Sequence, residues 1–370
     1  MRIGIFTHSL ADGGLTGQGT YVKELITGLS KKNDIEVILL YFHESEISYF
    51  KDLRSRKLPK ITIPKSPPMV FSPFFTRKLD LDLLHFPSDG ISPFINEKDN
   101  VVYTCHGVAP FVLSRKIHKP MNPIITRTLN NKHHAIKKII TPSMSSKKDI
   151  AEVFNIEEDK IEAIFHGINE QFFKPVDISE NEQFKNNNSL NYPYLLHVSN
   201  YQPMKNIEKI ISAFSNVSTK LQEHKLVLAG SKGWKYESIT NQISELDLQE
   251  KIVHFGKMDS KSLKILYSNA DMFLFPSLWE SFGFPAFEAM ACGTPAIISN
   301  TYSLAEIAGD SGLKVNPNSV DEISDGIMKI INNENLRNEL SRRGLETAEK
   351  LTWESAVNKH YELFNKLVNG

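Results

Sequence analysis

The sequence has few cysteines and no long hydrophobic run. Its two cysteines, Cys105 and Cys292, lie far apart and fit no metal-ligand spacing. A reducing compartment is the simplest interpretation. No segment approaches the roughly 18 uncharged apolar residues of a membrane-spanning helix, and Met1–Thr7 resembles a β-strand more than a signal peptide. These absences predict a cytoplasmic protein, either free or bound peripherally to the inner face of the membrane.

The chain also lacks net charge, since 43 Lys and Arg balance 43 Asp and Glu. Charge therefore gives no reason to expect a nucleic-acid partner. Its distribution is uneven: no acid occurs from Asn100 to Lys148, where nine Lys and Arg occur, and Lys51–Lys65 is basic as well. Such segments form either a solvated basic surface or a surface that contacts anionic lipid or a phosphorylated acceptor. The sequence leaves both open.

Short, continuously apolar runs alternate with longer helical patterns along the whole chain. Continuous rather than alternating apolarity indicates strands buried on both faces of a parallel sheet, so we predict two doubly wound α/β domains. The predicted strands are Ile3–Thr7, Glu36–Tyr41, Leu83–Phe86, Val101–Cys105, Lys138–Thr141, Ile161–Phe165, Tyr194–Val198, Lys225–Ala229, Ile252–Phe255, Met272–Phe275 and Ala296–Ser299.

A polar segment without apolar periodicity, Lys174–Tyr192, is interpreted as a linker. We therefore expect an N-terminal domain at 1–175 and a C-terminal domain at 193–352, with a ligand cleft between the carboxyl ends of their strands. Residues 353–370 have helical periodicity and are expected to pack back toward the N-terminal domain.

A strand, a loop and a helix follow one another at 272–291. Gly283 would let the backbone approach a phosphate at the helix N-terminus. Glu280 is placed on the loop and Glu288 on the first helical turn, so the two carboxylates could bind two sets of hydroxyls. The alternative is that Glu288 only stabilises the helix dipole and that Glu280 is a solvated loop residue. Spacing alone does not choose between them.

The wider stretch decides between these interpretations. Pro276-Ser-Leu-Trp-Glu-Ser-Phe-Gly-Phe-Pro-Ala-Phe-Glu-Ala-Met-Ala-Cys-Gly-Thr-Pro resembles the signature of the GT-B glycosyltransferases of family 4, in which two glutamates are separated by seven residues. The resemblance implies that Glu280 binds the donor sugar and Glu288 the ribose. It also implies that the loop from Ser281 through Phe282 and Gly283 to Phe284 holds the diphosphate.

A second match begins at the end of the strand Tyr194–Val198. The family usually has an Arg and a Lys five residues apart here, both on the diphosphate. This chain has Lys205 but carries Asn200 at the usual Arg position. An asparagine donates hydrogen bonds without supplying charge, so this phosphate contact is expected to be weaker or moved.

Two features of the first half complete the predicted site. Glycines 14, 17 and 19 follow the first strand, and the resemblance implies a loop that closes over the donor, formed by Gly14, Gly17 and Gly19. His106 follows the strand Val101–Cys105. By itself it could be a structural histidine; the resemblance implies that it hydrogen-bonds the donor sugar. We therefore predict His106, Lys205 and Glu280 as the catalytic residues.

The resemblance implies transfer of a hexose-type sugar from a UDP-sugar or GDP-mannose, with retention of configuration, to a glycan or lipid-linked acceptor. Cell-surface polysaccharide synthesis is the expected setting. No Asp-x-Asp motif occurs in the proposed site, so we expect no metal or other cofactor. Three alternatives remain: a GT-B enzyme of the UDP-GlcNAc 2-epimerase type, a nicotinamide-dependent dehydrogenase, and a nucleotide-sugar-binding protein without turnover.

Overall fold

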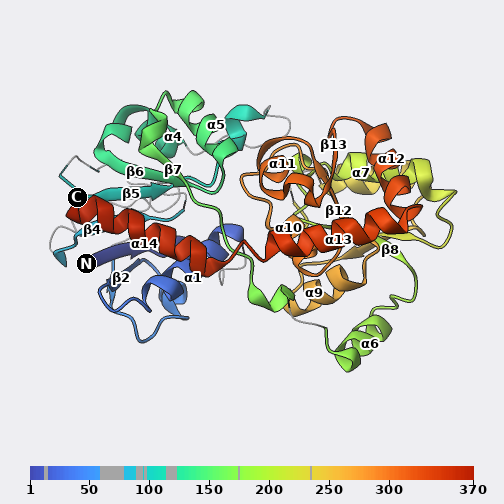
Figure 1. Ribbon diagram of the computed structural model, residues 1–370, viewed down its shortest axis with the longest axis horizontal. Coiled ribbons are helices and arrows are strands. Elements are labelled where there is room, and N and C mark those ends of the chain that lie inside the picture. Colours follow the sequence, from blue (N-terminus) through green and yellow to red (C-terminus); the bar gives the residue numbers. More distant parts are fainter. Residues whose placement is uncertain are drawn as a thin grey trace. The chain divides into compact units, whose positions relative to one another are not determined.

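The chain folds into two compact α/β units. The computed structural model describes residues 1–11, 16–58, 79–88, 95, 98–113, 123–173, 176–233 and 236–370. One unit consists of Met1–Val112, Pro120–Gly167 and Trp353–Gly370, and the other of Leu113–Lys119 and Ile168–Thr352. We call them unit 1 and unit 2 (Figure 1).

Unit 1 is built on a parallel seven-stranded sheet with the order β3-β2-β1-β4-β5-β6-β7. Chain order reverses between β1 and β4, which is the topological switch point of a doubly wound fold. The strands are β1 (Arg2–Phe6), β2 (Glu36–Tyr41), β3 (Ser55–Lys57), β4 (Leu83–Phe86), β5 (Val101–Thr104), β6 (Ile136–Thr141) and β7 (Ile161–Ala163).

Alternate residues of these strands enter two separate hydrophobic clusters. In β2, Val37 and Leu39 belong to the cluster beneath α1 and α14, while Ile38 and Leu40 belong to the cluster on the other face. Burial on both faces explains the continuous apolarity of the strand sequences. The helices are α1 (Gly17–Leu29), α3 (Ala109–Val112), α4 (Pro123–Lys132), α5 (Met144–Phe154) and α14 (Trp353–Asn369), with the short 3-10 helices η1 (His8–Leu10), η2 (Glu44–Ile47), η4 (His133–Ala135) and η5 (Glu158–Lys160).

The C-terminal helix α14 packs against α1 (Figure 1). Its buried residues, Ala356, Val357, His360 and Phe364, recur every three to four positions and so form one apolar face. The two helices approach closely at Gly28, where an added Cβ would lie 2.5 Å from Cγ2 of Val357. A side chain at position 28 would therefore separate α1 from α14.

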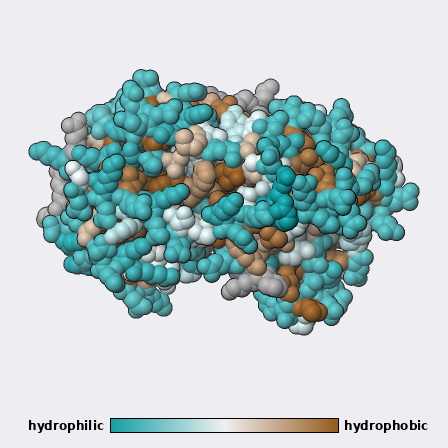
Figure 2. Space-filling model, viewed as in Figure 1, coloured by the Kyte–Doolittle hydropathy of each residue, from teal (hydrophilic) through white to brown (hydrophobic). Residues whose placement is uncertain are grey.

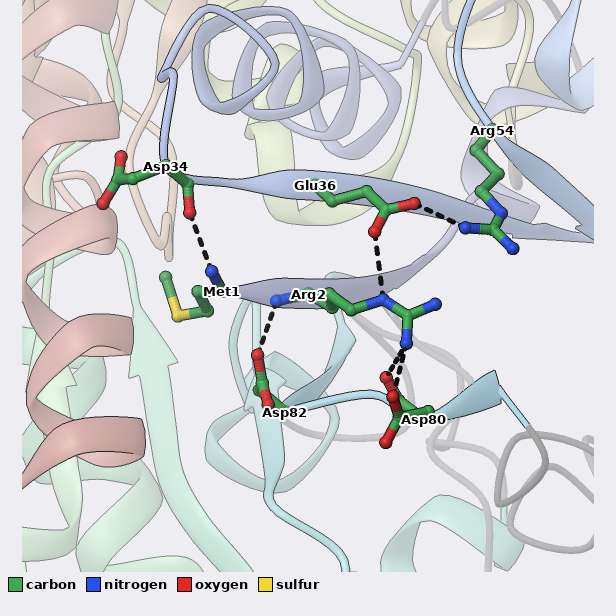
Figure 3. Close-up of polar contacts among 7 residues, drawn as sticks. All are labelled: Met1, Arg2, Asp34, Glu36, Arg54, Asp80 and Asp82. Carbon is green, nitrogen blue, oxygen red and sulfur yellow. Dashed lines mark hydrogen bonds and ion pairs between the residues drawn. The ribbon is translucent and has the colours of Figure 1, made fainter.

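Charged residues join the amino ends of three neighbouring strands of unit 1 (Figure 3). Arg2 Nε bonds Glu36 at 3.0 Å, and its Nη1 bonds the Asp80 carboxylate at 2.7 Å. The main-chain N–H of Arg2 donates to Asp82 at 2.7 Å, and Arg54 bonds the second oxygen of Glu36 at 2.7 Å. Arg2 is the centre of this network, which is exposed and therefore contributes little per pair.

Unit 2 is built on a parallel six-stranded sheet with the order β10-β9-β8-β11-β12-β13. The switch point lies between β8 and β11. The strands are β8 (Tyr194–Val198), β9 (Lys225–Ala229), β10 (Ile252–Phe255), β11 (Met272–Phe275), β12 (Ala296–Ser299) and β13 (Leu313–Val315). The helices are α6 (Ile178–Asn187), α7 (Ile207–Ser218), α8 (Tyr236–Glu245), α9 (Ser260–Asn269), α10 (Phe284–Ala291), α11 (Tyr302–Ala308), α12 (Val320–Ile331) and α13 (Glu334–Ala348), with 3-10 helices η6 (Glu170–Phe173), η7 (Pro203–Lys205) and η8 (Gly309–Ser311).

The predicted fold class, two α/β units on parallel sheets, is confirmed. One local expectation is wrong, because the segment interpreted as a linker contains the helix α6. Asp177 caps its first turn by accepting from the N–H of Glu180 at 3.0 Å. The helix is then held to α9 by Lys261 on Glu180 at 2.7 Å and by an amide pair between Asn181 and Asn269. Polar contacts, which leave no apolar period, stabilise its position.

The surface seen in Figure 2 is largely hydrophilic, with hydrophobic residues in several separate areas. Large apolar side chains that are exposed in the described segments are few and dispersed: Tyr49, Phe111, Met144, Ile178 and Leu246. Within these segments, no helix is both long enough and apolar enough to cross a bilayer.

Candidate active site

The carboxyl ends of β8 and β11 carry the predicted site loops of unit 2. These strands are neighbours in the sheet, on either side of the switch point. Chain after β8 reaches Lys205 at the end of η7, and chain after β11 reaches Glu280. The crevice at a switch point is where open α/β sheets bind ligands. The fold thus brings the two residues together although 75 positions separate them in the chain.

Lys205 and Glu280 form a buried ion pair. The distance from Lys205 Nζ to Glu280 Oε1 is 2.6 Å, and the two side chains are 15% and 9% exposed. The ammonium group also lies 5.5 Å from the ring centroid of Phe275, within cation–π range. An ammonium has three donors, so a single bond to Glu280 leaves capacity for an anionic ligand.

Asn206 anchors the loop that carries Lys205. It adopts a left-handed conformation with φ +63° and ends η7. Its Nδ2 donates to the carbonyl of Pro276 at 2.8 Å and to that of Pro317 at 2.6 Å. The N–H of Leu278 donates to the carbonyl of Met204 at 2.9 Å. These bonds tie the two site loops to each other.

Ser303 holds the loop that carries Glu280. It is fully buried in the first turn of α11. Its hydroxyl lies within bonding distance of two main-chain carbonyls, at 2.8 Å from Glu280 O and 3.2 Å from Phe282 O. These contacts therefore attach the loop from Glu280 to Phe282 to the first turn of α11. Sequence analysis did not single out Ser303 or Asn206, because their partners lie far away in the chain.

Helix α10 begins at Phe284, two residues earlier than the expected start at Ala286. Gly283 caps it with φ +97°, a conformation that favours glycine. Pro285 has no N–H, and the N–H of Ala286 is bonded to the carbonyl of Gly283 at 3.0 Å. The number of amides that this terminus can offer a phosphate is therefore smaller than the sequence suggested. Ser281 and Phe284 are partly exposed here, whereas Phe282 is buried.

Gly283→Ala is expected to destabilise unit 2 by about 1–2 kcal/mol, because left-handed backbone is strained for a residue with a Cβ. The added Cβ would also lie 2.5 Å from Cδ2 of Leu304. Urea denaturation measures the change. Gly256→Ala is the matched control, since a Cβ there meets nothing within 4 Å. An equal effect of both substitutions would contradict the assigned strain.

Glu288 lies on the second turn of α10 and not on the first, because the helix starts earlier than predicted. A role in stabilising the helix N-terminus is therefore not available to it. The residue is partly exposed, yet desolvation of its carboxyl group raises the pKa to about 7, and a hydrogen bond from Tyr267 opposes this rise. The Tyr267 hydroxyl donates to Glu288 Oε2 at 3.1 Å.

Asn200 is exposed at the end of β8. The backbone around it is tightly packed: a Cβ on Gly230 would lie 1.8 Å from the carbonyl oxygen of Ser199, and one on Gly233 would lie 2.3 Å from that of Tyr201. Beneath the loop, His197 is buried and neutral; burial lowers its pKa to about 4. Its Nδ1 donates to the carbonyl of Leu274 at 2.7 Å. The loop at Asn200 thus lies on tightly packed, hydrogen-bonded residues.

His106 belongs to unit 1, two residues after β5. Its Nε2 donates to the carbonyl of Pro87 at 2.8 Å. A carbonyl only accepts, so this bond assigns the Nε2–H tautomer to the neutral ring and makes Nδ1 an acceptor. The ring also meets Tyr21 edge to face, with centroids 5.0 Å apart. Such a ring can accept a hydrogen bond from a hydroxyl.

Next to His106 runs a buried hydrogen-bond chain whose direction its ends assign. His360 Nδ1 donates to the carbonyl of Ala356 at 2.7 Å, so its Nε2 accepts from the Tyr21 hydroxyl at 2.8 Å. Thr104 therefore donates to Tyr21 at 2.9 Å, and His85 Nε2 donates to Thr104 at 2.9 Å. These hydrogen bonds join α14, α1, β5 and β4, and they require a neutral His360, because its Nε2 accepts. It fastens α14 to unit 1.

The predicted glycine loop is not found at Gly17 and Gly19. Gly14 lies outside the described residues. Gly17 and Gly19 are not in a loop, because they form the first turn of α1. The N–H of Gly19 donates to the hydroxyl of Thr16 at 3.1 Å, so this amide already has a partner.

The described residues contain no group of three or more His, Cys, Asp or Glu side chains arranged to hold a metal ion. The independence of metal that we expect from the sequence therefore stays a prediction.

The fold and site define a class: a two-unit α/β protein of the GT-B type, with a buried acid–base pair at a switch point of the second unit. Residues 15–172 match the family described as Glycosyltransferase Family 4, and residues 178–347 match Glycosyl transferases group 1. The chain belongs to the group 1 glycosyltransferases of family 4.

Relatives extend over the whole chain. It is 24% identical over 371 residues to O-antigen chain mannosyltransferase B of Escherichia coli, covering 95% of this chain and 97% of that protein. It is 28% identical to the serotype-specific mannosyltransferase WbdA of Escherichia coli over 80% of this chain, but that match spans 36% of WbdA. The crystal structure of Anabaena HepE in complex with UDP-glucose has a TM-score of 0.78 at 14% identity, covering 99% of this chain and 100% of HepE.

Proposed function

We propose that this glycosyltransferase moves a hexose, with retention of configuration, from a nucleotide diphosphate sugar to a glycan or lipid-linked acceptor in cell-surface polysaccharide synthesis. The observation that carries the proposal is the buried Lys205–Glu280 pair. A cation at a switch point suits the diphosphate, and a carboxylate beside it suits sugar hydroxyls. GDP-mannose is the first candidate donor, because two relatives are named mannosyltransferases. UDP-hexoses are the second.

The proposed reaction is a substitution on one face of the sugar. The bond from the anomeric carbon to the phosphate oxygen breaks as the bond to the acceptor oxygen forms. The proton of the acceptor hydroxyl moves to the departing diphosphate. Lys205 stabilises negative charge that develops on the diphosphate, while Glu280 holds the sugar. In unit 1, His106 accepts a hydrogen bond from a sugar hydroxyl at Nδ1, and on unit 2 Glu288 binds the ribose.

A panel of nucleotides and nucleotide sugars tests the donor. The panel consists of GDP, UDP, GDP-mannose, UDP-glucose and UDP-GlcNAc. The ligands that carry the preferred base should raise the thermal stability of the protein, because a ligand of the folded state stabilises it by mass action. Turnover should persist in EDTA, and NMR of the product should show the anomeric configuration of the donor. A strict requirement for a divalent metal, or an inverted product, would contradict the mechanism.

The same panel separates the alternatives. Conversion of UDP-GlcNAc to its 2-epimer without an acceptor would indicate an epimerase, and binding of a nicotinamide cofactor would indicate a dehydrogenase. Binding of a nucleotide sugar with neither hydrolysis nor transfer would indicate a binding protein. Loss of hydrolysis or transfer in Glu280→Ala would exclude that last function.

Peripheral contact with anionic membrane is a further part of the proposal. The described part of the basic region includes the edge strand β3, whose residues Ser55–Lys57 are exposed. Residues 59–65 of that region, like 114–122 of the acid-free stretch, lie outside the described residues. Co-sedimentation should be stronger with vesicles containing about 30% anionic lipid than with neutral vesicles, and should weaken with salt. Equal sedimentation with both would remove this contact.

A further inference from the structure

Tyr267 of α9 places a buried hydroxyl next to the proposed site. The side chain is fully buried. Its ring meets Phe273 edge to face with centroids 5.5 Å apart, and Phe172 with centroids 5.9 Å apart. Its own carbonyl accepts from the hydroxyl of Thr294 at 2.6 Å. Ring and backbone are both held, so the hydroxyl has little freedom to move.

The hydroxyl is directed to one oxygen of one carboxylate. It donates to Glu288 Oε2 at 3.1 Å. Among the described residues, this is the only hydrogen bond to the Glu288 carboxylate. Oε1 therefore has no hydrogen-bond partner within the described residues, and Glu288 as a residue is partly exposed. A carboxylate held at one oxygen presents the other in a defined orientation, which suits two adjacent hydroxyls better than a freely rotating group does.

We propose that Tyr267 is a positioning residue for the nucleotide: its hydroxyl fixes the Glu288 carboxyl group by one oxygen and so presents the other oxygen to the ribose hydroxyls. This inference rests on the proposed ribose contact of Glu288. It adds a residue that contacts no ligand itself. The fixed phenol reduces the ordering that Glu288 would otherwise undergo on binding.

The environment of Glu288 provides a readout that separates positioning from simple packing. Desolvation raises the pKa of Glu288 to about 7, and the Tyr267 hydrogen bond opposes this rise. Cys292, which follows α10, is a further titratable group nearby, and burial keeps it as a neutral thiol; Lys264 of α9 lies near Cys292 in turn. Removing the phenol hydroxyl should therefore raise the pKa of Glu288 further. More alkaline solution would then be needed to ionise it.

The test measures binding of free GDP and UDP by calorimetry from about pH 6 to about pH 9. Near pH 7, Tyr267→Phe should weaken binding roughly ten-fold or more, as expected for the loss of a hydrogen bond to a charged group. Part of this loss should be recovered near pH 9, where Glu288 ionises without the phenol. The remaining loss at that pH measures the missing orientation of the carboxylate. Glu288→Gln should bind weakly at every pH, with no such recovery.

Tyr194→Phe is the matched control. Tyr194 is also a buried tyrosine of unit 2, but its hydroxyl donates to the carbonyl of Leu266 at 2.8 Å and not to a carboxylate. It should lose a similar amount of thermal stability and keep the affinity and pH profile of the wild type. Three results for Tyr267→Phe would overturn the inference: wild-type binding at every pH, the same loss at every pH, or complete recovery near pH 9. If the wild type bound neither nucleotide, the proposed function itself would fail.

Discussion

Lys205→Met is expected to lower kcat/KM for the donor by about 10²–10³-fold, equivalent to about 3–4 kcal/mol of transition-state stabilisation. The reason is the position of the ammonium group, which belongs to a largely buried side chain, 2.6 Å from Glu280 and at the switch point of unit 2. Charge on a leaving diphosphate is stabilised most strongly by a cation that is already in place and shielded from water. Steady-state transfer, or donor hydrolysis without an acceptor, measures the loss.

Lys205→Met also leaves a buried carboxylate without its partner, so stability and catalysis must be separated. Breaking a buried pair from one side can cost about 3–5 kcal/mol, whereas removing both charges costs much less. The double variant Lys205→Met/Glu280→Gln should therefore regain most of the unfolding free energy that the single variant loses. It should not regain activity. Urea denaturation and kinetics of all four proteins form the required cycle.

Lys209→Met is the matched control. Lys209 lies four residues further on, in α7, and its ammonium donates to the carbonyl of Asn318 at 2.7 Å in an exposed position. Its loss should change kcat/KM by less than about two-fold, because exposed charge contributes little. Retention of a third or more of wild-type activity by Lys205→Met would contradict the assigned role.

Unit 1 is expected to unfold in mild acid before unit 2. Burial holds the pKa of His360 at about 4 and those of His85 and His166 well below their usual range. In the unfolded chain these histidines bind a proton near pH 6.5. Between that pH and the lower pKa of the folded state, the unfolded chain binds more protons, so stability falls as the pH falls. The slope is about 1.4 kcal/mol per pH unit for each such histidine.

In unit 2 the destabilising effect of buried histidines in acid is partly offset by a buried carboxyl group. Burial lowers the pKa of His197 to about 4 and also lowers that of His254. Burial raises the pKa of Glu288 to about 7, however. Folded unit 2 therefore holds a proton on Glu288 that the unfolded chain releases above about pH 4.5, which favours folding in acid. Unit 1 has no described carboxylate whose pKa is raised in this way.

Hydrogen exchange resolves the two units when it is corrected for the intrinsic pH dependence of exchange. From pH 7 to pH 5, segments from β1, β5 and α14 should lose protection before segments from β8 and β11 do. His360→Gln should flatten the pH dependence of unit 1 by about one histidine, because a Gln side chain can accept from Tyr21 without titrating. The exposed His134→Ala should not change it. Equal loss of protection in both units would contradict the prediction.

Local sequence predicted most strands correctly because burial on both faces of a sheet imposes continuous apolarity. Seven strands, including β2, β8 and β11, have the predicted bounds without change. The strands β3 and β13 were missed. Both are three-residue edge strands; β3 has only exposed polar residues, and Lys314 at the centre of β13 is exposed. An edge strand needs fewer apolar residues, so its sequence carries a weaker signal.

The site was partly predicted. Lys205 and Glu280 were chosen from the resemblance, and the structure places them in direct contact. The start of α10 was misplaced by two residues, since Phe284 and Pro285 occupy the first helical positions that proline favours. Glu288 therefore moved to the second turn. Tyr267, which bonds it, was not predicted, because contacts between α9 and α10 have no local signature.

The sequence by itself determined the family, the two doubly wound units and the choice of Lys205 and Glu280 as site residues. Those properties follow from short-range patterns: apolar runs, loop glycines and a motif of fixed spacing. Tertiary structure alone decided how these residues are held. Asn206 bonds the carbonyls of Pro276 and Pro317, and His360 accepts from Tyr21 across 339 positions. Such contacts depend on which strands are neighbours and on which helices cover them, and only the folded sheets set both.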